Sequence, residues 1–184
     1  MRQSYHGSIR RGLFGLAVVA ATASLSAQPT PKTQFVQVEP DVRLEVLDWG
    51  GHGRAVVLLA GGGDTAHVYD ELARKLTPAH HVVGITRRGF GASSRPQTGY
   101  SSTSLGDDIL RVLDALKIEK PVLIGHSVAG DEMSSIGARR SDRIAGLIYL
   151  DAATDRTYVL PPDQKCGADC DMLDSYPFIL EQNM

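Results

Sequence analysis

Residues 33–50 alternate apolar and polar side chains on both sides of Pro40 and Asp41. A period of two is typical of strands with one buried face, so this segment is predicted to form a β-hairpin. Residues 55–60 follow as a continuous apolar run of strand length, which predicts a strand covered on both faces. A Gly-Gly-Gly-Asp segment at residues 61–64 ends this run.

The chain then alternates helix-like and strand-like segments up to residue 150. Helices are predicted where apolar residues recur every three or four positions, and strands where short apolar runs occur. The predicted helices cover residues 66–76, 104–118 and about 128–139, and the predicted strands cover residues 81–86, 121–125 and 144–150. Ser104 and Asp107 form a capping-box pattern at the start of the second helix. The alternation predicts a mostly parallel α/β sheet, flanked by helices, with right-handed crossovers.

Residues 1–27 have the pattern of a secretory signal peptide. Three arginines precede an apolar stretch that ends in small residues and is short for a membrane span. Cleavage near Ala27 is therefore expected, which predicts a secreted or periplasmic protein without a stable membrane anchor. The proline-containing residues 28–34 are expected to be a linker, and residues 35–151 are expected to be the folded core.

The charge and cysteine content narrow the classes of partner. The formal net charge is −2, and it becomes −5 without the leader and its three arginines, so no nucleic-acid or anionic-lipid partner is expected. Cys166 and Cys170 are the only two cysteines. In an oxidising compartment such a pair forms a local disulfide or remains as two free thiols, and without further ligands nearby it predicts no metal site.

The segment VLIGHSVAGDEM, residues 122–133, places Ser127 between a predicted strand and a predicted helix. A serine hydroxyl is a weak nucleophile, and an enzyme that uses one exposes it, provides a base and directs backbone N–H donors at the oxyanion. A sharp strand-turn-helix exposes the serine, and it directs the Val128 amide from the positive end of the helix. The G-x-S-x-G pattern runs from Gly125 to Ala129, with alanine as its last residue. The alternative role of such a serine is to start a helix.

Together with its neighbours, this pattern resembles the α/β-hydrolase family, over residues 35 to about 155. The segment LLAGGGDT resembles the family's oxyanion loop after the third strand, with Ala60 where many members have histidine. RRGFGASSRP resembles the loop after the fourth strand, and RIAGLIYLDAA resembles the sixth strand. The resemblance implies an α/β-hydrolase type of sheet, and it implies that the amides of Gly62 and Val128 form the oxyanion hole.

The resemblance also implies a triad of serine, acid and histidine, and here the chain departs from the family's pattern. All six histidines precede Ser127. His67 alone is predicted to lie at the serine's end of the sheet, while His126 is expected to point away from the serine. Asp151, at the end of its strand, lies on the edge expected for the acid. The family usually places that acid one strand later, and an aspartate after a strand is commonly a turn residue.

These departures predict the front part of a longer enzyme, without its last strands and its catalytic histidine. Residues 152–184 are then expected to be the start of a lid or cap segment. The expected activity is that of an exported serine hydrolase that acts on the ester-type carbonyl of a small-molecule substrate, without a metal or an organic cofactor. The alternative is a catalytically inactive, hydrolase-like binding protein.

A second alternative is a dinucleotide-binding domain. Residues 61–66 match G-x-G-x-x-A after a strand and before a helix, and Arg87 and Arg88 follow the next strand, where they suit a 2′-phosphate. Against this alternative stand the predicted hairpin ahead of the first parallel strand and the serine turn two strands later.

Overall fold

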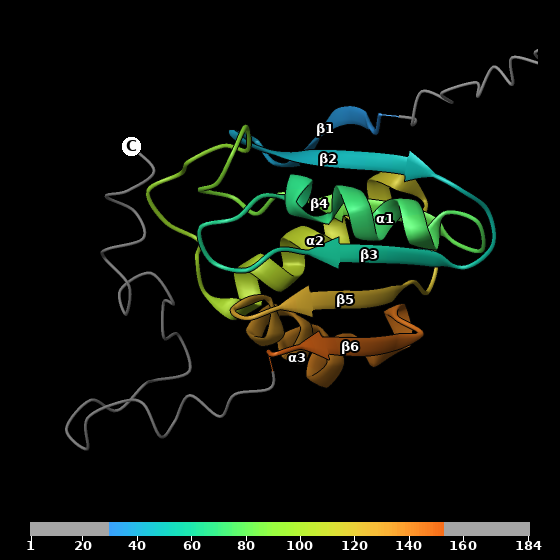
Figure 1. The fold of residues 1–184 in the computed structure, drawn as a ribbon. Helices are drawn as coiled ribbons and strands as arrows, with labels where there is room; N and C mark the ends of the chain where they lie inside the picture. The colour runs from blue at the N-terminus through green and yellow to red at the C-terminus, as the bar shows by residue number, and fades with distance from the viewer. Residues whose placement is uncertain (1–29, 153–184) are drawn as a thin grey trace, which may run out of the picture.

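The computed structural model describes residues 30–152, and the predicted leader, lid segment and cysteines lie outside these residues. A six-stranded sheet with the order β1-β2-β4-β3-β5-β6 forms its centre (Figure 1). The strands are β1 (Lys32–Glu39), β2 (Val42–Gly50), β3 (Ala55–Leu59), β4 (His81–Ile85), β5 (Val122–His126) and β6 (Gly146–Leu150). The mostly parallel α/β sheet predicted from the sequence is confirmed.

The two N-terminal strands form the predicted hairpin. β1 pairs antiparallel with β2, and β2 pairs antiparallel with β4. The other pairs, β3 with β4, β3 with β5 and β5 with β6, are parallel. β1 begins at Lys32, inside the segment predicted as a linker, because residues 32–34 continue the ladder opposite Val46, Leu47 and Asp48.

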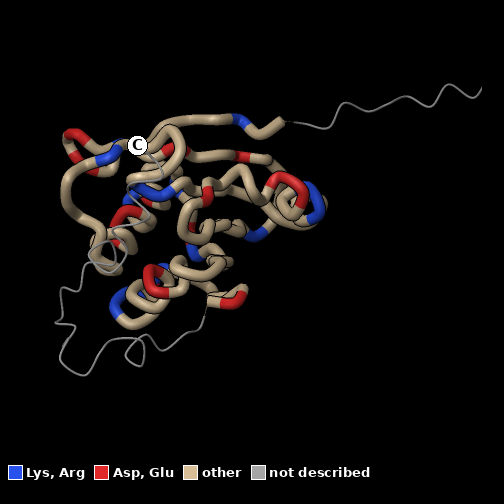
Figure 2. Tube along the Cα trace, turned by 60° about the vertical axis from the view of Figure 1, so that its left-hand side comes forward, with Lys and Arg blue, Asp and Glu red and all other residues tan. Residues whose placement is uncertain are grey.

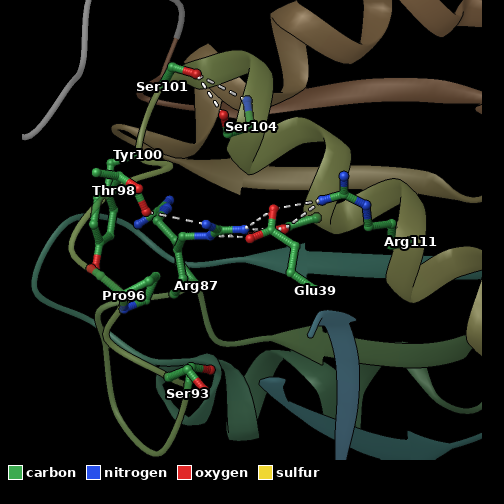
Figure 3. A network of polar contacts seen from close by, with 12 residues as sticks. Glu39, Arg87, Ser93, Pro96, Thr98, Tyr100, Ser101, Ser104 and Arg111 are labelled. Carbon is green, nitrogen blue, oxygen red and sulfur yellow. Dashed lines mark hydrogen bonds and ion pairs between the residues drawn. The ribbon is translucent and has the colours of Figure 1, made fainter. Parts of the chain in front are cut away.

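Two of the predicted helix starts are wrong. Residues 66–76 were predicted as one helix but form a 3-10 turn, η1 (Ala66–Tyr69), followed by α1 (Asp70–Leu76). The cap of α2 (Ser102–Leu116) is Ser101, not Ser104, and the Ser101 side chain accepts from the Ser104 N–H at 3.2 Å (Figure 3). Because Ser101 has extended backbone while Ser104 is already helical, only Ser101 satisfies the free N–H groups of the first turn.

Helices cover both faces of the sheet, as the apolar run at residues 55–60 predicted. α2 and α3 (Ala129–Arg140) pack on one face, and η1 and α1 pack on the other. β3 is buried on both sides, since Val57 and Leu59 contact the first cluster whereas Val56 and Leu58 contact the second. A short 3-10 turn, η2 (Ser141–Arg143), joins α3 to β6. β3 and β5 therefore form a rigid support for the loops at their carboxyl ends.

The strand order bears on the dinucleotide alternative. A dinucleotide-binding sheet of the doubly wound type has the order 3-2-1-4-5-6, whereas this sheet has an antiparallel hairpin at one edge and the order 1-2-4-3-5-6. The glycine-rich loop after β3 therefore belongs to a sheet whose topology differs from that of a dinucleotide-binding domain, which argues against this alternative. In the described part of the chain, no helix is long and apolar enough to cross a membrane.

Candidate active site

Ser127 lies in a sharp turn between β5 and α3. Its φ of +52° is in the left-handed region, which a non-glycine residue occupies only at a cost. A Cβ on Gly125 would lie 2.3 Å from Met133 Sδ and 2.9 Å from Ala129 Cβ, so only glycine allows the strand and the helix to approach this closely. The turn has the geometry of a nucleophile elbow, with Ser127 half-buried and Val128 capping α3.

The end of β6 lies beside this turn. The Ser127 N–H donates to the Leu150 carbonyl at 3.3 Å, one step beyond the register pair of His126 with Leu150. Asp151 therefore follows β6 at the level at which Ser127 follows β5. Asp151 is exposed, and its φ of +48° is typical of a turn. The structure thus places the predicted acid near the serine, but Asp151 contacts no histidine among residues 30–152.

The glycine-rich loop after β3 reaches the serine. A Cβ on Gly61 would lie 3.4 Å from Ser127 Cβ and 2.7 Å from His126 Nδ1, so the exposed imidazole of His126 lies against the loop. Gly62, predicted to supply one oxyanion donor, follows directly and is exposed. Val128, predicted to supply the other, is buried at the first turn of α3. The fold therefore brings both predicted donors to the edge of the sheet that carries Ser127.

Hydrogen bonds to three consecutive carbonyls hold this loop in place. The Tyr69 hydroxyl donates to the Leu59 carbonyl at 2.9 Å, Arg87 Nη2 donates to the Ala60 carbonyl at 3.0 Å, and the Asp64 N–H donates to the Gly61 carbonyl at 3.3 Å. Burial raises the pKa of Tyr69 to about 12, so its hydroxyl remains a donor at neutral pH. Sequence reasoning identified the loop but none of the side chains that hold it.

Arg87 also forms a buried ion pair with Glu132. The guanidinium follows β4, the carboxylate lies on α3, and their side chains are 9% and 3% exposed. Burial raises the pKa of Glu132, and the charge and hydrogen bond of Arg87 act in the opposite direction. Sequence reasoning missed Glu132. A signal was present, because Glu132 lies three residues after Ala129 and four before Ile136, on the apolar side of its helix.

His67 does not lie at the serine. Its Nε2 atom is 3.4 Å from Glu45 Oε1 on β2, and β4 and β3 separate β2 from β5 in the sheet. The buried Glu45 also accepts from the Thr86 hydroxyl at 2.7 Å. Within residues 30–152, the Ser127 hydroxyl forms no hydrogen bond, to a histidine or to any other residue.

A second buried network connects the loop after β4 to α2 and β1. Arg88 donates to both carboxylate oxygens of Asp108 at 2.6 Å, and to Glu39 Oε1 at 3.1 Å. Glu39 also accepts from Arg111 at 3.2 Å, as Figure 3 shows. Hydrogen bonding by Arg88 lowers the pKa of Glu39. This network ties the loop after β4 to α2 and β1, and Arg88 and Asp108 line the same cavity as Arg87, Glu132 and Ala60.

The described residues offer no cluster of metal ligands. Between residues 30 and 152, no group of three or more histidine, cysteine, aspartate or glutamate side chains is arranged to hold a metal ion. Acidic and basic residues are interspersed along the chain in the view of Figure 2.

Known proteins share this arrangement. The family model of the alpha/beta hydrolase fold matches residues 54–167, more than half of the chain. Esterase YbfF of Escherichia coli (strain K12) is 36% identical over 114 residues, which cover 61% of this chain and 44% of the esterase. Epoxide hydrolase A of Mycobacterium tuberculosis is 32% identical over 133 residues, which cover 67% of this chain and 39% of that hydrolase.

A solved structure shows the same similarity in three dimensions. The structure titled "Est816 as an N-Acyl homoserine lactone degrading enzyme" has a TM-score of 0.65 and 28% sequence identity, and the match covers 70% of this chain and 49% of that one. The match thus spans less than half the length of each of these three proteins. The sheet, the serine turn, the matching family model and these relatives agree, and the chain belongs to the alpha/beta hydrolase fold family.

Proposed function

We propose that the protein is a serine hydrolase that cleaves ester-type carbonyl compounds, with Ser127 as its nucleophile. The observation that carries the proposal is the backbone of Ser127, held at a φ of +52° between β5 and α3 and against the glycine-rich loop. Strained backbone persists where the surrounding structure enforces it, and it is concentrated at active sites. A serine that caps a helix with its side chain typically has extended backbone, as Ser101 has at α2, and needs no such conformation.

In the proposed reaction, Ser127 Oγ attacks the carbonyl carbon of the substrate. The new O–C bond forms as the carbonyl π electrons move to oxygen, and the Ser127 proton passes to a histidine base. Collapse of this intermediate expels the alcohol, which takes the proton from the histidine. Water then attacks the acyl-serine in the same way and releases the acid and the free serine.

The amides of Gly62 and Val128 are the proposed oxyanion donors. The N-terminus of α3 carries a partial positive charge that favours a developing anion near Val128. The Gly61 carbonyl accepts from the Asp64 N–H, and in a trans peptide the N–H of Gly62 points away from that carbonyl. The Gly62 amide is thereby free of the turn and available to a ligand.

The proposed mechanism also needs a base and an acid. None of the histidines among residues 30–152 is hydrogen-bonded to Ser127, so the histidine of the mechanism is a group that these residues do not supply. Asp151 is proposed as the acid on the basis of its position after β6, next to β5. An active site with a serine and an oxyanion hole retains some catalysis without the full triad. The turnover of a model ester is therefore the quantity to measure.

The proposed substrate class follows from the chemistry of the serine and from the relatives. An esterase resembles this chain, and so does an enzyme that degrades a lactone, a compound with an ester bond. We further propose export to a secreted or periplasmic location, with residues 1–27 as the signal peptide. Sequencing of the mature N-terminus tests that location, and a protein that begins at Met1 would contradict it.

The decisive experiment compares the full-length protein with its Ser127→Ala variant. We expect hydrolysis of p-nitrophenyl acetate to fall more than about 1,000-fold in kcat in the variant. We also expect a fluorophosphonate probe to label the wild type and not the variant. Ser134→Ala is the matched control, because Ser134 is an exposed serine on the same helix. Equal turnover in the wild type and in Ser127→Ala would overturn the proposal, and no turnover in either would favour a binding protein.

A further inference from the structure

Arg87 connects three separate segments around the serine turn. Its Nε atom donates to Glu132 on α3, and its Nη2 atom donates to the Ala60 carbonyl at 3.0 Å. Its guanidinium carbon also lies 5.7 Å from the centre of the Phe90 ring, in the loop after β4. Two hydrogen bonds and the contact with the Phe90 ring restrain the position of the guanidinium.

The Ala60 carbonyl is a group that the sheet leaves without a partner. β3 ends at Leu59, so Ala60 lies one residue beyond the strand, and it is buried at 5% exposure. A buried carbonyl without a donor costs free energy comparable to a lost hydrogen bond. Arg87 supplies that donor, and its charge makes the hydrogen bond stronger than a neutral one.

The direction of this carbonyl determines the start of the glycine-rich loop. The peptide between Ala60 and Gly61 is planar and trans, so the Gly61 N–H points opposite to the Ala60 carbonyl. Holding the carbonyl on Arg87 therefore fixes the plane from which Gly61 and Gly62 continue. Gly61 lies so close to the turn that its Cβ would be 3.4 Å from Ser127 Cβ.

We propose that Arg87 is a positioning residue that sets the oxyanion loop against the serine turn, through Ala60 on one side and Glu132 on the other. The inference rests on the proposed function, because it concerns the geometry of the proposed oxyanion hole. Glu132 lies five residues after Ser127, on the helix that begins with the proposed donor Val128. Arg87 therefore contacts both segments that supply the proposed donors, the loop that contains Gly62 and the helix that begins after Val128.

The test uses the double variant Arg87→Met with Glu132→Leu in the full-length protein. Replacing both members of a buried ion pair by apolar residues is often neutral for stability, so this variant is expected to fold while the Ala60 carbonyl loses its donor. We expect kcat for p-nitrophenyl acetate to fall about 10- to 100-fold with KM unchanged within about twofold. Affinity for a phosphonate transition-state analogue should fall by the same factor as kcat, since both measure the oxyanion hole.

A second readout does not depend on catalysis. In ¹⁵N spectra, the amide resonances of Gly61 and Gly62 are expected to move in the double variant and to stay in place in the control Arg140→Met. Arg140 is suitable because it pairs only with Asp142 near the opposite end of the sheet. A double variant that folds with unmoved Gly61 and Gly62 resonances and an unchanged kcat would overturn the inference.

The design separates the two proposals. If Ser127→Ala retains full turnover, the serine mechanism fails, and the amide resonances still decide whether Arg87 positions the loop.

If the double variant does not fold, Arg87→Lys replaces it. Lysine keeps the charge but lacks the planar fork that reaches Glu132 and Ala60 together, so the same loss in kcat and the same moved resonances are expected. Wild-type values in Arg87→Lys would then contradict the inference.

Discussion

Arg87 and Arg88 are consecutive residues that bind different partners. Both follow β4 and both are buried, at 9% and 1% side-chain exposure. Arg87 turns to α3 and the glycine-rich loop, whereas Arg88 turns to Asp108 on α2 and Glu39 on β1. Both helices pack on the same face of the sheet, and the two arginines line one cavity with Asp108 and Glu132, so one loop serves the proposed site and the scaffold from the same side. The comparison teaches that equal burial and charge do not imply equal roles.

The largest effect is expected on the scaffold side. Arg88→Met leaves the buried Asp108 without its bidentate partner, and breaking a buried pair in this way costs about 3–5 kcal/mol. Urea unfolding measures the loss. The double variant Arg88→Met with Asp108→Leu should regain most of it, because no unpaired charge remains. If Arg88→Met were as stable as the wild type, Arg88 would have no larger role in stability than Arg87.

The site side should respond in activity rather than in stability. In Gly61→Ala, the new Cβ would meet His126 Nδ1 at 2.7 Å, and the exposed imidazole can turn aside while the loop shifts from Ser127. We expect kcat for the model ester to fall about 10-fold, with an unchanged urea midpoint. Adding His126→Ala makes room and should restore part of kcat. A large loss of stability with unchanged kcat would place Gly61 with the scaffold instead.

The helix cap beside the scaffold network should have a smaller effect. Ser101→Ala removes the acceptor for the Ser104 N–H and is expected to lower the free energy of unfolding by about 1 kcal/mol. Ser102→Ala is the control, since Ser102 is already in the first turn of α2, and it should change stability by less than about 0.5 kcal/mol. Equal effects of the two substitutions would contradict the assignment of Ser101 as the cap.

The smallest effect is a change in the pH dependence of stability. Arg88 lowers the pKa of Glu39 in the folded protein below its ordinary value, so Glu39 binds its proton more weakly in the folded state than in the unfolded state. The stability that it contributes is present above the unfolded pKa and is lost as the pH falls through the folded pKa. Glu39→Gln should therefore flatten the fall in stability in acid, as measured by thermal unfolding between pH 3 and 7. An identical slope in both proteins would show that Glu39 is not coupled to Arg88.

Much of the fold was predictable because its signals are local. The alternation in β1 and β2 and the apolar runs of β3, β4 and β5 have the periods of the structures that they form. The serine turn was predictable because its strand, small residues and helix are adjacent in the sequence. Family resemblance added the proposed role of Gly62 as an oxyanion donor, which periodicity alone does not give.

The missed features depend on contacts between distant segments. Arg87 and Glu132 are separated by 45 residues, and Arg88 and Asp108 by 20. Charged residues are mostly exposed, so sequence reasoning treats them as surface unless a partner is known. Asp108 carried the same signal as Glu132, since it lies on the apolar stripe of α2 between Leu105 and Val112. A carboxylate in an apolar stripe predicts a buried cation, although not which one.

The left-handed backbone at Ser127 has an evolutionary consequence. A non-glycine residue in that conformation costs about 1 kcal/mol or more, and glycine adopts it freely, with part of the gain offset by its greater freedom in the unfolded chain. Drift under selection for folding alone would therefore favour glycine at this position and delete the hydroxyl. The proposed nucleophile role of Ser127 would oppose that drift, so laboratory selection for thermal resistance without an activity screen should recover Ser127→Gly.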